Sequence, residues 1–208
     1  MSGPLLVEVI RGGRVESLHE VDAVLLDASG RIVEAWGDAT RPVMPRSAIK
    51  PIQALPLVST GAADAFLLTD VELALACASH GGEPAHVDAV AAWLARLDLD
   101  ASALACGVQV PSSVPAAAVL AAAGGEATAV HNNCSGKHTG FLTVLRHLGL
   151  SLDGYLDPGH RLQADHVTPS IERTCGVDLT AAHPGVDGCG IPVWSMPLDR
   201  LASGWATI

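Results

Sequence analysis

The sequence has very little lysine: Lys50 and Lys137 are the only two among its 12 basic residues, and the other ten are arginine. Acidic residues outnumber basic ones by 22 to 12, for a net charge of −10. Nucleic-acid binding needs a clustered positive surface, so this balance argues against it. Because only lysine can lose its proton near neutral pH, the two lysines are candidates for roles that arginine cannot fill.

Long apolar runs and secretion signals are also missing. No run approaches the ~20 residues of a membrane span. The N-terminus lacks the basic start and apolar core of a signal peptide. The five cysteines show no paired spacing of the disulfide-framework kind, which favours a reducing compartment. We therefore expect a cytoplasmic protein with no membrane partner. Apolar residues make up 49%, which argues against extensive disorder.

A length of 208 residues fits one domain or most of one. The pattern predicts strands within residues 5–36, with turns at Gly12-Gly13 and at 27–30. Helices are expected at residues 47–59, 69–77, 84–96, 116–123 (a buried helix), 135–148, 159–175 and 198–208. Strands followed by many helices indicate an α+β fold. The last apolar stripe is still in phase at Ile208, so we expect the complete polypeptide to continue.

The first polar cluster is Arg46-Ser47-Ala48-Ile49-Lys50. Positions three apart share a helix face, so Ser47 Oγ and Lys50 Nζ can meet. A desolvated, neutral lysine can take the proton of a serine nucleophile. The alternative is an exposed serine near a solvated lysine.

The second cluster, Ser79-His80-Gly81-Gly82-Glu83, follows a predicted helix. Its glycines permit a close backbone approach or a left-handed cap. A catalytic loop and a plain helix cap with a polar loop are both compatible with this pattern.

The third cluster runs from His131 to Gly140 and contains Cys134, Lys137 and His138. Such a run at a loop-to-helix junction can bind an anion and lower the pKa of a thiol. A plain polar turn, the alternative, rarely combines these residue types.

The fourth cluster is Asp187-Gly188-Cys189-Gly190. Its glycines allow close presentation of the Cys189 thiol. Cys134 and Cys189 could share a metal site, since zinc takes thiolate ligands, although spacing alone leaves this pairing open.

Taken together, the clusters resemble the thermolabile (Rhizobium-type, class 3) L-asparaginase family, often called asparaginase II. The matching stretches are 47–53, 79–83, 131–138 and 187–192. The resemblance covers essentially the whole chain, whereas the family's domain is longer. Residues 1–208 are therefore expected to form the N-terminal two-thirds of a single asparaginase domain.

This resemblance implies a serine-β-lactamase/glutaminase-like fold, a homodimer, and hydrolysis of L-asparagine to L-aspartate and ammonia. It implies two Ser–Lys pairs: Ser47 with Lys50, and Ser79 with a lysine from the C-terminal part, which this sequence lacks. It also implies a zinc site. The expected zinc ligands are Cys134, Lys137 and Cys189, and the expected substrate-binding residues are His80, Asn133, His138 and Asp187.

Either Ser47 or Ser79 could form the acyl-enzyme. Three other functions stay open: a glutaminase or other serine amidase on the same fold, a zinc-binding fragment with impaired catalysis, and a cysteine hydrolase that uses Cys134 and His138.

Overall fold

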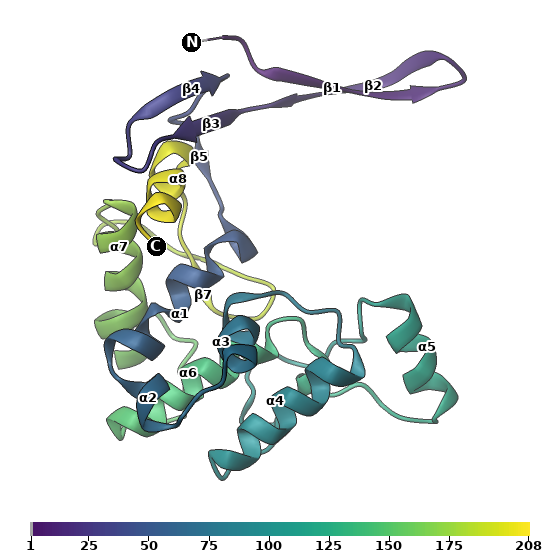
Figure 1. Cartoon of the computed structure of the whole chain (residues 1–208), viewed down its shortest axis with the longest axis vertical. Helices are drawn as coiled ribbons and strands as arrows, with labels where there is room; N and C mark the ends of the chain where they lie inside the picture. The colour runs from purple at the N-terminus through teal and green to yellow at the C-terminus, as the bar shows by residue number, and fades with distance from the viewer. Residues whose placement is uncertain (1) are drawn as a thin grey trace. The chain divides into compact units, whose positions relative to one another are not determined.

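The structure is a computed structural model that describes residues 2–208 (Figure 1). The chain divides into two units, one of residues 2–45, 171–182 and 194–208, and one of residues 46–170 and 183–193. Helices are mixed with small antiparallel sheets, which confirms the α+β class. No helix within residues 2–208 is long and apolar enough to cross a membrane.

The first unit contains the N-terminal hairpins. Gly12 and Gly13 have positive φ angles of 56° and 74°, which let the chain reverse between β1 and β2. Every residue of β1 and β2 is exposed. α8 packs on β3. The elements are β1 (Leu5–Arg11), β2 (Arg14–Val21), β3 (Ala23–Leu26), β4 (Ile32–Trp36), β5 (Pro42–Val43), β8 (Met196–Pro197) and α8 (Leu198–Thr207).

The second unit is mainly helical and carries all of the predicted site residues. Its elements are η1 (Arg46–Ile49), α1 (Lys50–Ser59), α2 (Ala62–Ala65), α3 (Asp70–Cys77), α4 (Pro84–Arg96), η2 (Ala101–Ala103), α5 (Val114–Ala122), η3 (Ala129–His131), α6 (Ser135–Leu148), η4 (Leu162–Val167), β6 (Gly185–Val186) and β7 (Pro192–Val193). α7 (Thr168–Cys175) begins in this unit and ends in the other.

Helix α6 is the centre of the second unit. It packs against α1, α2, α3 and α4, and all of its residues from Ser135 to Leu145 are buried. The buried set includes polar side chains, among them Lys137, His138 and Thr139. Burying polar groups is unfavourable unless they find partners. The hydrogen-bond partners of these buried polar groups therefore determine which role α6 has in the site.

Helix α5 differs from the expectation of a buried helix at residues 116–123. The helix forms, but Ala116 is its only buried residue, while Val114 and Val119 are 79% and 60% exposed. Alanines dominate this segment, and small side chains gain little from burial. The apolar composition therefore predicts the helix correctly and its burial wrongly.

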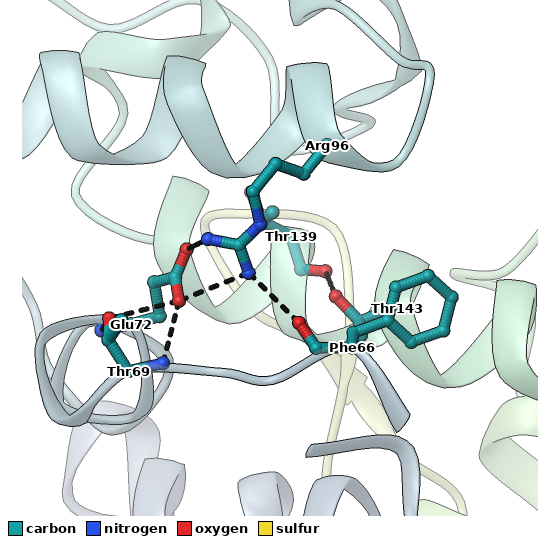
Figure 2. A network of polar contacts seen from close by, with 6 residues as sticks. All are labelled: Phe66, Thr69, Glu72, Arg96, Thr139 and Thr143. Carbon is teal, nitrogen blue, oxygen red and sulfur yellow. Dashed lines mark hydrogen bonds and ion pairs between the residues drawn. The ribbon is translucent and has the colours of Figure 1, made fainter. Parts of the chain in front are cut away.

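Helix α3 begins within one residue of the predicted start, and Thr69 is its N-cap. The Thr69 hydroxyl accepts the Glu72 N–H at 3.3 Å, and a Glu72 carboxylate oxygen accepts the Thr69 N–H at 2.8 Å. Arg96 of α4 forms an ion pair with the same carboxylate at 2.5 Å and also donates to Phe66 O at 3.2 Å (Figure 2). The Glu72 side chain is only 6% exposed. One buried carboxylate therefore caps α3 and links it to α4.

Removal of Arg96 tests this link. Arg96→Ala leaves the buried Glu72 carboxylate without its cation, and we expect the free energy of unfolding to fall by about 2 kcal/mol. The matched control is Arg161→Ala, because Arg161 pairs with Asp165 on the surface, where both side chains are well exposed. The control should change stability by less than about 0.5 kcal/mol in urea denaturation followed by circular dichroism. Equal effects of the two variants would contradict the assignment.

Candidate functional site

Lys50 and Ser79 meet in the second unit. Lys50 is the first residue of α1 and is fully buried. Its Nζ lies 2.5 Å from Ser79 Oγ and donates to Ala78 O at 3.0 Å. α3 ends at Cys77, so Ser79 lies in extended chain just beyond the helix. Burial lowers the pKa of Lys50, and the nearby charge of Lys137 lowers it further. This amine is suited to exchanging a proton with the serine hydroxyl.

The pairing of Lys50 differs from both Ser–Lys pairs expected from the sequence. Ser47 lies in the 3₁₀ turn η1 and is exposed. Among residues 2–208, no hydrogen bond joins it to Lys50. The buried amine takes the acceptors at the end of α3 instead. Ser79, expected to use a lysine from the C-terminal part, is therefore in contact with Lys50.

A sulfur-containing cluster lies at the start of α6. Lys137 Nζ donates to Cys189 Sγ at 3.2 Å, and all three of Cys134, Lys137 and Cys189 are buried. A hydrogen bond from Cys134 lowers the pKa of Cys189, and His138 and Lys137 lower it further. The same hydrogen bond, together with burial, raises the pKa of Cys134. The opposite directions of the two pKa shifts favour a Cys189 thiolate beside a Cys134 thiol.

His138 lies behind this cluster. Its Nδ1 is 2.7 Å from the Tyr155 hydroxyl, which accepts the Ala105 N–H at 2.8 Å. Burial lowers the pKa of His138, so the ring is neutral. Its Nε2 is buried and has no hydrogen-bond partner within the described chain. His138 therefore lies in the interior, next to Cys189, rather than at the surface.

The donors at this cluster suit a soft divalent cation. Within residues 2–208, no group of three or more His, Cys, Asp or Glu side chains could hold a metal ion. The expected ligand set differs in kind, because its third member is Lys137, which contacts Cys189. Two thiols, an amine that can bind metal when neutral, and the unpartnered His138 Nε2 fit the chemistry that zinc requires.

Beside the cluster is a polar cavity of ≈ 170 Å³. Ser47, Asn133, Cys134, Asp187 and Cys189 all contribute to its lining. Residues from three of the four sequence clusters therefore meet around one small volume, although they lie up to 142 positions apart in the sequence.

Two further residues, for which the sequence predicted no role, also line the cavity: Arg46 and Gln109. The Arg46 guanidinium pairs with Asp187 at 2.6 Å. Its backbone is left-handed, with φ of 48°, an uncommon conformation for a residue with a side chain. The position of Arg46 next to Ser47 was the only available signal. Gln109 accepts the Asn133 N–H at 3.3 Å, and nothing in the sequence marked it.

Comparison with protein families identifies the family of the chain. The L-asparaginase II family model matches residues 7–208. The chain belongs to the L-asparaginase II family. No curated protein matches the chain. Membership confirms the resemblance drawn from the four clusters. It places the chain among the asparagine amidohydrolases, whose substrates are small molecules.

In this family member, His80 follows Ser79 and is only 5% exposed. Burial, together with the charges of His86, Lys50 and His131, lowers the pKa of His80 from 6.5 to about 4. The folded protein therefore holds this ring neutral at pH values where an unfolded chain would protonate it.

This pKa predicts a specific acid sensitivity. Below about pH 6.5 the unfolded chain binds a proton at His80 and the folded chain does not until about pH 4, so stability falls as the pH decreases between these values. We expect the fall between pH 7 and 4.5 to be smaller in His80→Gln by about 1–2 kcal/mol, after allowance for solvent screening. Urea denaturation at each pH measures it. An unchanged pH dependence in the variant would show that His80 titrates normally.

Proposed function

We propose that this chain hydrolyses L-asparagine to L-aspartate and ammonia through a covalent intermediate on Ser79, with Lys50 as the base. The observation that carries the proposal is the 2.5 Å contact between Lys50 Nζ and Ser79 Oγ. Its support is the lowered pKa of the buried amine, which increases the neutral fraction able to accept a proton. Family membership supplies the substrate class.

The chemistry follows from these two groups. Neutral Lys50 takes the hydroxyl proton as Ser79 Oγ attacks the side-chain carboxamide carbon of asparagine. The Gly81 N–H makes no hydrogen bond among the described residues and is free to stabilise the developing oxyanion. Protonated Lys50 returns the proton to the leaving nitrogen, ammonia departs, and a β-aspartyl ester remains. Water, deprotonated by Lys50, then cleaves the ester and releases aspartate.

The polar cavity suits the amino-acid end of the substrate. Asparagine carries an α-ammonium and an α-carboxylate, which complement the charges of Asp187 and Arg46 in the cavity lining. Asn133 and Ser47 add neutral hydrogen-bonding groups. Cys134 connects this cavity to the reacting pair, because it lines the cavity and interacts with Lys50. We therefore assign substrate binding to Arg46, Ser47, Asn133 and Asp187.

We also propose that Cys134, Lys137 and Cys189 bind one zinc ion. A bound zinc would supply a fixed positive charge beside the polar cavity. The thiolate character of Cys189 and the contact with Lys137 support this ligand set. His138 lies next to this set and, together with the hydrogen bond from Cys134, lowers the pKa of Cys189.

Two further proposals rest on family membership: a serine-β-lactamase/glutaminase-like architecture and a homodimeric assembly. A cytoplasmic location is proposed separately, from the unpaired cysteines.

Serine replacement tests the mechanism. Ser79→Ala removes the proposed nucleophile, and we expect kcat for ammonia release from asparagine to fall at least about 10³-fold. Ser47→Ala should affect mainly KM, because Ser47 lines the cavity. A larger loss of kcat in Ser47→Ala than in Ser79→Ala would make Ser47 the nucleophile. Full turnover in both variants would rule out a serine mechanism. Glutamine, assayed in parallel, measures amide specificity.

Zinc content tests the metal proposal independently of turnover. We expect elemental analysis of the purified protein to find about one zinc per chain, and almost none in Cys189→Ala. Cys175→Ala is the matched control, because this buried cysteine lies in α7 and belongs to the other unit. Equal zinc content in the wild type and Cys189→Ala would contradict the ligand assignment.

A further inference from the structure

Both ring nitrogens of His80 are engaged by the protein. The Gly82 N–H donates to Nδ1 at 3.2 Å, and Nε2 lies 2.8 Å from Ser135 Oγ. Ser135 Oγ in turn donates to Val130 O at 2.9 Å. A backbone N–H can only donate, so Nδ1 must be unprotonated. The neutral ring then carries its proton on Nε2 and donates it to Ser135.

The hydrogen bonds from Gly82 to His80 and from His80 to Ser135 form a relay. This relay joins two segments that are distant in sequence. His80 is 5% exposed and Ser135 is fully buried. The backbone makes a parallel connection, because the His80 N–H donates to Asn133 O at 3.2 Å. The residue after Ser79 is therefore held by both its side chain and its main chain to the segment that begins α6.

Ser79 itself has few such restraints. It lies beyond the last turn of α3, where Ala78 is already extended. Its exposed side chain has one hydrogen-bond partner in the described chain, Lys50 Nζ. Apart from the bonds of Lys50 to Ala78 and Ser79, its anchored neighbour His80 limits where the hydroxyl can lie.

We propose that His80 is a positioning residue that acts through Ser135 to hold the Ser79 hydroxyl beside Lys50. The proposal rests on the proposed function of Ser79 and Lys50. It also departs from the substrate-binding role expected for His80, because neither ring nitrogen is left for a ligand. Misplacing a reacting atom by about 1 Å can lower a rate about 100-fold, so a residue with no contact to substrate can still control turnover.

The test compares variants that break the relay at different points. His80→Asn keeps an acceptor near the Nδ1 position but cannot reach Ser135, and Ser135→Ala removes the acceptor of Nε2. We expect each to lower kcat for asparagine by roughly 10- to 100-fold, with KM changed less than about threefold. His80→Gln, whose amide can still donate toward Ser135, should recover part of the loss.

Two comparisons distinguish positioning from general damage. The double variant His80→Asn/Ser135→Ala should be no slower than the worse single variant, because both break one relay. His86→Asn is the matched control: His86 stacks on His80 at a centroid distance of 5.1 Å but is outside the relay. It should keep kcat within about threefold of the wild type. Multiplicative losses in the double variant, or an equal loss in His86→Asn, would overturn the proposal.

Labelling by phenylmethylsulfonyl fluoride measures the reactivity of Ser79 and, together with turnover, separates the positioning role of His80 from the proposed mechanism. If Ser79→Ala keeps full turnover, the proposed function fails. If Ser79 is required, yet His80→Asn and Ser135→Ala label and turn over like the wild type, only the positioning role fails. If the variants do not fold, nitrogen-15 NMR of the wild type still tests the proposal, because it reports the tautomer of His80. A neutral Nε2–H tautomer at pH 7 is expected, and an Nδ1–H tautomer would overturn the relay.

Discussion

The close approach of α3 and α6 at Gly136 is the constraint on which the candidate site depends. A Cβ atom at this position would lie 2.5 Å from Leu75 O, a separation that real Cβ atoms essentially never show. The absence of a side chain therefore lets the last turn of α3 reach the first turn of α6. Ser79 follows α3 by two residues, and Cys134 immediately precedes α6. This contact brings the Lys50–Ser79 pair and the sulfur cluster into one region.

Burial of two lysines in one region is the second constraint. Both amines would be unfavourable there as isolated charges. Their partners differ: Lys50 contacts a hydroxyl and a carbonyl, whereas Lys137 contacts the Cys189 sulfur. An anionic Cys189 offsets the positive charge of the adjacent Lys137. The lowered pKa of Lys50 reduces the cost of burying its amine, because the neutral form becomes more populated. Arginine has a planar guanidinium that stays protonated, so it could not relieve its burial by deprotonation. This is a physical reason for the survival of two lysines in an arginine-rich chain.

Local signals in the sequence predict where helices begin better than they predict which side chains come into contact. The N-cap at Thr69 and the proline at position 84 mark where α3 and α4 begin, because these signals act within a few residues. The polar run at 131–140 marks the start of α6 for the same reason. The partner of Lys50 could not be predicted in this way. Spacing on one helix points to Ser47, but the buried amine takes Ser79, 29 residues away. The left-handed backbone of Arg46 is likewise a tertiary property that cannot be predicted from the residue type.

The site combines two environments with different demands. At the cavity, the side chains of Arg46 and Asp187 form an ion pair at 2.6 Å; the Arg46 side chain is 62% exposed and that of Asp187 is 8% exposed. In the interior, His80 and His138 are neutral because burial lowers the pKa of each. In the proposed function, a zwitterionic substrate is recognised by charge at the cavity, while its amide faces Ser79 and Lys50 in surroundings that favour proton transfer. Cys134 belongs to both environments, so a ligand that moves its sulfur also alters the surroundings of Lys50. The proposed function therefore couples binding and chemistry through this residue, even though the cavity lining contains neither Ser79 nor Lys50.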